Sequence, residues 1–141
     1  MSGRKARGRV ISVVSAAIVR DGALLVVRKR GTDSFMLPGG KGEPGETEAE
    51  TLQRELREEL GCGLHSDGLA LLGHFEAPAA NEPGCLVRAA IYRGDLDGVP
   101  VIAAEIAEML WLDVEGEEDP PIRLAPLLNR HVLPALRDVV A

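Results

Sequence analysis

Residues 40–62 read GKGEPGETEAETLQRELREELGC, and this stretch decides the interpretation of the whole chain. It opens with a loop rich in glycine and then carries seven glutamates between positions 43 and 59. Thr47 and Glu50 have the spacing of a capping box at the start of a helix, and Gly61 suits its end. Apolar residues recur every three or four positions and predict an amphipathic helix over residues 47–60: Ala49, Leu52, Leu56 and Leu60.

The glutamates of this helix are more crowded than ion pairing explains. Arg54 can pair with Glu50 and Glu58, but Glu55 and Glu59 have no basic residue three or four positions away. Like charges at that spacing destabilise a helix by about 0.2–0.5 kcal/mol per pair. Carboxylate oxygens on a rigid helix are hard ligands for Mg²⁺ or Mn²⁺, and these ions also bind phosphate oxygens. The pattern therefore predicts divalent cations beside the helix and an anionic substrate.

The spacing of these residues resembles the Nudix box, G-x5-E-x7-R-E-U-x-E-E-x-G-U, in which U is a bulky aliphatic residue. The matching positions are Gly40, Glu46, Arg54, Glu55, Leu56, Glu58, Glu59 and Gly61. Cys62 departs from the last aliphatic position, although cysteine packs as a small apolar side chain. The resemblance to the MutT-like Nudix hydrolases implies an α/β fold, a Nudix-type α/β/α sandwich around a mixed β-sheet.

The resemblance also implies the residues of a metal site. Glu55, Glu58 and Glu59 match the family's divalent-metal ligands, and a backbone carbonyl of Gly39 or Gly40 adds a further one. The implied cofactor is Mg²⁺, with Mn²⁺ as a substitute.

Two further roles follow from the same resemblance. Arg54 and Glu46 match an ion pair that orients the loop against the helix, and both belong to the expected catalytic set together with the three glutamates. The general base is a glutamate of the helix in some members of the family, for which Glu55 is the best match here. In other members it comes from a later loop, where this chain offers Glu105 and Glu108.

Nudix enzymes hydrolyse a diphosphate linkage in compounds that join a nucleoside diphosphate to a further group. Because this chain is short and lacks an added domain, we expect nucleoside triphosphates or their modified forms as substrates, giving a nucleoside monophosphate and pyrophosphate. ADP-ribose or a nucleotide sugar is the alternative, since Pro78, sixteen residues beyond Cys62, resembles a feature of ADP-ribose-cleaving members. A non-catalytic module that senses a nucleotide or binds a protein is a third interpretation, but such modules usually lose glutamates of the box.

Five other residues are candidates for contact with the substrate, each with an ordinary structural alternative. Arg28, Lys29 and Arg30 could bind phosphates or could form the solvated end of a strand. Trp111, the only tryptophan, could stack on a nucleobase or could belong to the core. Glu82 could approach the site if its turn-like loop folds over it.

The remainder of the chain predicts several strands and one more helix. Strands are expected at residues 10–19, 23–30, 69–77, 85–93 and 106–112, a loop at 115–121 and a final helix at 125–139. The first two strands are expected to pair through a turn at Asp21-Gly22. Pro134 can kink the final helix.

The 141 residues predict a single domain over residues 10–141, preceded by a basic flexible tail at residues 1–9. The net charge of −6 argues against general nucleic-acid binding, which needs a basic surface. No segment reaches the roughly 20 apolar residues of a membrane span, and two isolated cysteines predict reduced thiols in a cytoplasmic protein. The expected partner is a small-molecule nucleotide, without nucleic acid or membrane. Many Nudix relatives form dimers, so a homodimer stays open.

Overall fold

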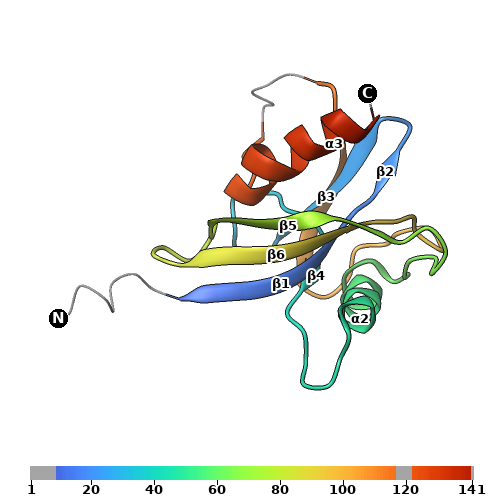
Figure 1. Cartoon of the computed structure of the whole chain (residues 1–141), viewed down its shortest axis with the longest axis horizontal. Coiled ribbons are helices and arrows are strands. Elements are labelled where there is room, and N and C mark those ends of the chain that lie inside the picture. The colour runs from blue at the N-terminus through green and yellow to red at the C-terminus, as the bar shows by residue number, and fades with distance from the viewer. Residues whose placement is uncertain (1–8, 117–121, 141) are drawn as a thin grey trace.

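The computed structural model describes residues 9–116 and 122–140 (Figure 1). Most of the expected tail at residues 1–9 and most of the expected loop at 115–121 lie outside these residues. In chain order the elements are β1 (Val10–Ala17), β2 (Val19–Arg20), β3 (Ala23–Lys29), β4 (Gly39–Gly40), α2 (Glu48–Leu60), β5 (Ala70–Pro78), β6 (Leu86–Arg93), β7 (Ile106–Asp113), the π-helical turn η1 (Leu128–Val132) and α3 (Leu133–Val140). Within the described residues, no helix combines the length and apolar character that crossing a membrane requires.

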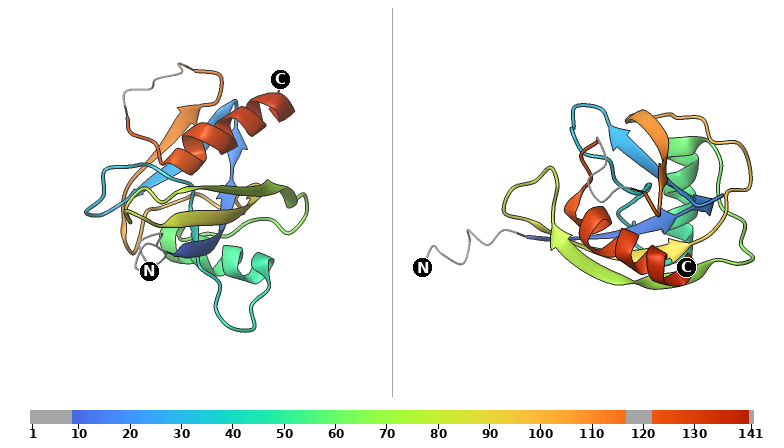
Figure 2. Two further views of the ribbon diagram at one scale, coloured as in Figure 1. Left: turned by 60° about the vertical axis from the view of Figure 1, so that its left-hand side comes forward. Right: turned by 90° about the horizontal axis from the view of Figure 1, so that it is seen from above.

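The strands form two sheets. One sheet has the order β4-β1-β6-β5, with β1 and β6 parallel and the other neighbours antiparallel, and the second has the order β2-β3-β7. Helix α2 lies on one side of the strands and the η1–α3 helix lies on the other, as the views in Figures 1 and 2 agree. The expected α/β/α sandwich with a mixed sheet is therefore confirmed.

The prediction that residues 10–19 pair with residues 23–30 is wrong for most of its length. Strand β1 pairs with β4 and β6, and only the short β2 forms the expected hairpin with β3. The turn between them has positive φ at Asp21 and Gly22, as a tight hairpin turn requires. The chain passes from one sheet to the other at the fully buried Ile18, and the apolar residues 16–19 gave no sign of that change.

Each helix has its own apolar core against the strands. Leu52, Leu56 and Leu60 of α2 pack with the core that includes Leu25 and Val27 of β3. The C-terminal helix packs against the opposite side, where Leu24 and Val26 of β3 belong to its core together with Leu128, Val132, Leu133 and Leu136. Strand β3 thus supplies alternate side chains to both cores, as a strand buried on two faces does.

Helix α2 ends as the sequence predicts. The Thr47 side chain accepts a 3.1 Å hydrogen bond from the Glu50 amide, and the Glu50 carboxylate accepts a 2.9 Å bond from the Thr47 amide, so the capping box is complete. Gly61 closes the helix with φ 73°, and its amide donates to the Arg57 carbonyl at 3.0 Å. These caps fix the first and last turns of the helix that carries the glutamates.

The C-terminal helix is irregular close to the expected kink. Its segment Leu128–Val132 is a π-helical turn in which the Leu133 amide donates to the Leu128 carbonyl. Pro134 follows directly, has no amide hydrogen and in a regular α-helix would collide with the carbonyl four residues earlier. A wider turn before the proline relieves that collision, and π-turns of this kind are inserted singly into α-helices.

Candidate active site

The loop before α2 is tied to the helix by Arg54. Its guanidinium contacts both carboxylate oxygens of Glu46, with Nε–Oε2 at 2.7 Å and Nη2–Oε1 at 2.9 Å, and Nη2 also donates to the Lys41 carbonyl at 3.0 Å. The Thr51 hydroxyl donates to Glu46 at 2.8 Å. The hydrogen bonds from Arg54 lower the pKa of Glu46 to about 2, so this carboxylate is charged at all physiological pH values. The expected pair of Arg54 and Glu46 is present and holds residues 41–46 against the helix.

Arg54 also reaches two of the helix glutamates. Its Nη1 lies 3.0 Å from Glu55 Oε2 and 3.6 Å from Glu58 Oε2. Glu55 therefore has an ion-pair partner in the adjacent Arg54, although no basic residue lies three or four positions away. The rule of three and four positions omits the adjacent residue, whose long arginine side chain reaches the Glu55 carboxylate.

Glu59 lies in a different environment from the other two. It is 6% exposed, and its Oε1 accepts a 3.2 Å hydrogen bond from the Gly39 amide. Among the described residues, no lysine, arginine or histidine forms an ion pair with it. Burial raises the pKa of Glu59 to about 7. The negative charges of Glu55 and Glu58 add to this effect, whereas the hydrogen bond from the Gly39 amide and the charge of Lys29 oppose it. A buried carboxylate of this kind gains most from a cation placed beside it.

Gly39 and Gly40 bring the backbone close to these carboxylates. Gly39 has φ +148°, and a Cβ there would lie 2.2 Å from the Val14 carbonyl oxygen. A Cβ at Gly40 would lie 2.4 to 2.7 Å from the carboxyl atoms of Glu55. A side chain at position 39 would collide with the β1 backbone, and one at position 40 would displace the Glu55 carboxylate, so the two glycines let β4 lie close to both β1 and α2.

Gly40 and the three glutamates of α2 line one cleft of about 510 Å³. The α2 wall presents Glu55, Glu58 and Glu59, and the opposite walls come from loops that are distant in the sequence. The other charged or polar residues of the lining are Lys29, Thr32, Lys41, Asn81, Glu82 and Glu105. The cleft lining therefore combines clustered carboxylates with two lysines.

Of the expected general bases, the structure brings Glu55 and Glu105 to the cleft. The Glu105 carbonyl accepts a hydrogen bond from the Arg30 amide at 2.8 Å, which fixes the backbone beside the cleft. Glu108 lies outside the lining and pairs with Arg28, with Arg28 Nε 2.7 Å from Glu108 Oε1.

The expected substrate-binding residues divide in a similar way. Glu82 lines the cleft and pairs with Arg9 at 3.7 Å. Neither Arg28 nor Arg30 lines the cleft. Trp111 lies on β7 and is 38% exposed, and the Arg20 guanidinium is 5.9 Å from the centroid of its ring. Trp111 therefore belongs neither to the core nor to the cleft.

Of the three basic residues expected to contact phosphates, Arg28, Lys29 and Arg30, only Lys29 lines the cleft. In a strand, alternate side chains share a face, so Lys29 continues the face of Leu25 and Val27, which pack against the α2 core. Arg28 lies on the other face and donates to the Thr32 carbonyl at 2.8 Å. Counting alternate residues along the strand from Leu25 and Val27 would have singled out Lys29. The run from Ala23 to Val27 is apolar on both faces of the strand, however, so the sequence does not show which of the two faces is directed toward α2.

The carboxylates suit a magnesium-type cation that is shared with a substrate. Within the described residues, no three histidine, cysteine, aspartate or glutamate side chains are gathered closely enough to enclose a metal ion by themselves. Mg²⁺ does not require such a cage, because it keeps several waters and binds through one or two carboxylates plus substrate phosphates. The donor set of the α2 wall, all oxygen and including the buried Glu59, has the chemistry that this ion prefers.

The fold defines the class of protein. The chain is similar to the crystal structure of a MutT NUDIX hydrolase from Burkholderia pseudomallei, with 26% identity and a TM-score of 0.75 over 92% of this chain and 99% of that one. It is also similar to the solution structure of the ORF135 protein from E. coli, with 28% identity and a TM-score of 0.73 over 94% and 92% of the two chains.

The family model for the NUDIX domain matches residues 9–136. The chain belongs to the NUDIX family, as the box in residues 40–62 predicted. Among curated relatives, the CTP pyrophosphohydrolase of Escherichia coli (strain K12) is 42% identical over 57 residues, which are 38% of this chain and 42% of that protein. The RNA pyrophosphohydrolase of Halorhodospira halophila (strain DSM 244 / SL1) is 49% identical over 43 residues, 30% and 24% of the two chains. The matches span less than half of either relative.

Proposed function

We propose that the protein is a divalent-metal-dependent pyrophosphohydrolase that cleaves nucleoside triphosphates, or their modified forms, to a nucleoside monophosphate and pyrophosphate. The observation that carries this proposal is the cleft in which Glu55, Glu58 and Glu59 face Lys29 and Lys41. Carboxylates that attract cations and lysines that attract phosphates are both needed to hold a polyphosphate in an otherwise acidic protein.

Glu55, Glu58 and Glu59 would hold Mg²⁺, or Mn²⁺ in its place, with a backbone carbonyl of Gly39 or Gly40 as a further ligand. When bound, such an ion neutralises charge on the phosphoryl oxygens and lowers the pKa of a coordinated water. The family is typically dependent on divalent metals, and the buried Glu59, which forms no ion pair with any described residue, supports the assignment in this chain.

The protein's own residues orient the groups that react. Arg54 fixes the loop 41–46 through Glu46 and restrains Glu55 through Nη1, so the carboxylates are positioned before substrate binds. Either Glu55 or Glu105 accepts the proton of the water that attacks phosphorus, since both lie on the walls of the cleft. The bond that breaks joins phosphorus to the bridging oxygen, and pyrophosphate leaves with that oxygen.

The name of the CTP pyrophosphohydrolase supports a nucleoside triphosphate as the substrate, and the name of the RNA pyrophosphohydrolase supports the same class of reaction. ADP-ribose or a nucleotide sugar is the second candidate. It is favoured by Pro78, which lies at the position expected for ADP-ribose-cleaving members and lines an apolar pocket beside the cleft. A non-catalytic module is the least supported alternative, because all the glutamates of the box are present.

With Mg²⁺ present, we expect hydrolysis of nucleoside triphosphates to a monophosphate and pyrophosphate, measured by chromatography of the products across a substrate panel. EDTA should stop turnover without changing the circular dichroism spectrum, because both apolar cores are formed without the cleft carboxylates. Added Mg²⁺ should restore activity.

Three results of this panel would contradict the proposal. Release of orthophosphate would place the cleavage at another bond, and cleavage of ADP-ribose or a nucleotide sugar alone would favour the second candidate. Nucleotide binding without turnover of any compound would favour the non-catalytic module.

Replacing Arg54 by lysine is expected to lower kcat/KM by about 10- to 100-fold, the usual effect of losing a residue that orients metal ligands. Lysine keeps the charge but cannot contact both oxygens of Glu46 and also reach Glu55. Arg57→Lys is the matched control on the same helix, because Arg57 is largely exposed and only approaches Asp97 at 3.9 Å. Equal activity of the two variants would show that the contact of the Arg54 guanidinium with both oxygens of Glu46 is not needed for turnover.

A further inference from the structure

The segment between β6 and β7 brings Glu105 to the cleft with little support from side-chain packing. Val101 is 66% exposed and Ile102 is 39% exposed, and residues 103–105 are exposed as well. These side chains belong to neither apolar core. The course of residues 101–105 therefore depends on hydrogen bonds of their backbone.

The backbone of this segment is fastened to the last turn of α2. The Val101 amide donates to the Leu60 carbonyl at 2.8 Å, and the Ala103 amide donates to the Glu59 carbonyl at 2.9 Å. The last carbonyls of an α-helix have no partner within the helix, so these two bonds satisfy groups that the helix leaves open. One of the two acceptors belongs to the residue whose buried carboxylate faces the cleft.

A tight turn connects these bonds to Glu105. The Ile106 amide donates to the Ala103 carbonyl at 3.1 Å, which closes a turn with Ala104 as its second residue and Glu105 as its third. Ala104 has φ 54°, whereas Glu105 does not have a positive φ. This pattern is typical of a type II′ turn, whose second residue is usually glycine. An alanine in this conformation is strained, and such strain persists only where the surrounding structure imposes it.

The Glu105 carboxylate has no partner that would hold it in place. Within the described part of the chain, no ion pair and no side-chain hydrogen bond includes it. Glu55 differs, because its carboxylate lies 3.0 Å from Arg54 Nη1. The place of the Glu105 carboxylate in the cleft is therefore set by the backbone of the turn.

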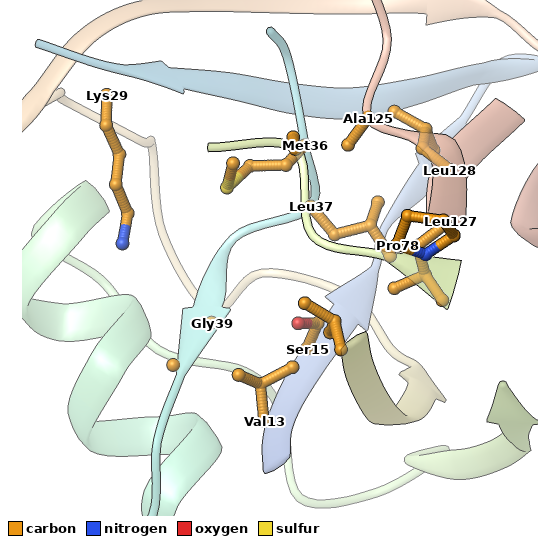
Figure 3. A pocket seen from close by; sticks show the side chains of 13 residues that line it. Val13, Ser15, Lys29, Met36, Leu37, Gly39, Pro78, Ala125, Leu127 and Leu128 are labelled. Atoms are coloured by element: carbon orange, nitrogen blue, oxygen red, sulfur yellow. The ribbon is translucent and has the colours of Figure 1, made fainter. Parts of the chain in front are cut away.

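We propose that Ala104 is a positioning residue whose strained turn, fastened to α2 through the amides of Val101 and Ala103, sets the place of the Glu105 carboxylate. The assignment rests on the proposed function, in which Glu105 is one of two candidate proton acceptors. Ala104 and Glu105 line the carboxylate cleft and not the apolar pocket beside it, which Figure 3 shows. A change at Ala104 should therefore lower kcat and leave KM close to the wild-type value.

Ala104→Val tests the turn, because a β-branched residue tolerates positive φ poorly. The turn should rearrange and lower kcat by about 10- to 100-fold, since a misplacement of about 1 Å costs about 10²-fold in rate. Ala104→Gly is the conservative variant, which keeps the turn without strain and should retain the wild-type kcat.

Asp21→Val is the matched control. Asp21 is the other non-glycine residue with positive φ in the described chain, with φ 51° in the hairpin turn between β2 and β3. The same new side chain in a left-handed conformation should lower the unfolding temperature there and leave kcat unchanged, because Asp21 does not line the cleft.

A double variant shows whether Ala104 acts through Glu105. Glu105→Gln should lower kcat by about 100-fold, within the usual contribution of a positioned acid–base group. In that background Ala104→Val should lower kcat further by less than about threefold, because both changes act through one carboxylate. Crystal structures give a readout that does not need turnover, and the Glu105 carboxylate should move by about 1 Å or more in Ala104→Val but not in Ala104→Gly.

Wild-type kcat in Ala104→Val or in Glu105→Gln would overturn the assignment. So would additive losses in the double variant, or a loss in Ala104→Gly or Asp21→Val as large as that in Ala104→Val. A wild-type protein that hydrolyses no nucleotide, while Glu105 is displaced in Ala104→Val crystals, would contradict the proposed function alone. Hydrolysis by the wild-type protein, with Glu105 unmoved in Ala104→Val, would contradict this inference alone.

Discussion

Glu59→Gln is expected to abolish hydrolysis and, at the same time, to make the metal-free protein more stable. The carboxylate is 6% exposed, and burial raises its pKa from 4.5 to about 7. One pKa unit corresponds to about 1.4 kcal/mol, so keeping this group ionised at pH 8 opposes folding by about 3 kcal/mol. Glutamine keeps the oxygen that accepts the Gly39 amide and carries no charge.

The direction of the pH dependence follows from the same shift. Because the folded protein binds the Glu59 proton more tightly than the unfolded chain, this group lowers the stability as the pH rises from about 4.5 to about 7. Above about pH 7 its effect is constant. The stability gained by Glu59→Gln in EDTA should therefore be small near pH 4.5 and largest at pH 8.

Thermal unfolding in EDTA between pH 4.5 and pH 8 tests this prediction, and turnover with Mg²⁺ tests its functional half. Glu58→Gln is the matched control for stability, since the Glu58 side chain is 53% exposed and gains little from losing its charge. An unfolding temperature of Glu59→Gln at or below that of the wild type at pH 8 would show that the buried charge is not destabilising. Turnover of Glu59→Gln at the wild-type rate would show that Glu59 has no part in the active site.

Gly40→Ala is expected to lower kcat by about 100-fold or more while the protein stays folded. The new methyl group would lie 2.4 Å from the carboxyl carbon of Glu55, so this flexible side chain has to move. Displacing a positioned group by about 1 Å is enough for a loss of about 10²-fold in rate. The measurement is steady-state kinetics combined with the unfolding temperature.

Two other glycines provide the comparison. Gly42→Ala meets only the Thr51 hydroxyl, at 3.1 Å, and should retain most of the activity. Gly39→Ala should fail to fold, since its φ is +148° and its Cβ would lie 2.2 Å from the backbone oxygen of Val14. Full activity of Gly40→Ala would mean that the position of Glu55 does not matter for the reaction.

The helix and its loop could be predicted from the sequence because the signals are local. The capping box and Gly61 act within one turn of the helix ends, the apolar stripe lies between them, and α2 begins and ends where these signals indicate. The pairing of β1 with β6 depends on residues more than 70 positions apart. An apolar run that is buried on both faces carries no information about its partner.

The site could be predicted only in part, for a related reason. The glutamates of α2 share one short segment, so their spacing reveals them. The opposite wall is assembled from Lys29, Glu82 and Glu105, which meet only after the sheets have formed. Arg28, Lys29 and Arg30 were all expected as phosphate contacts, and strand alternation directs only Lys29 of the three toward the cleft.

The most direct test of the account is anomalous scattering from Mn²⁺ in crystals grown with a non-hydrolysable nucleoside triphosphate. We predict manganese peaks against the carboxylates of Glu55, Glu58 and Glu59 that also contact the phosphates of the analogue, and no such peaks in Glu59→Gln crystals. The central claim is that this acidic helix holds the metal that binds the diphosphate. A nucleotide bound in the cleft with no manganese beside these three glutamates would contradict it.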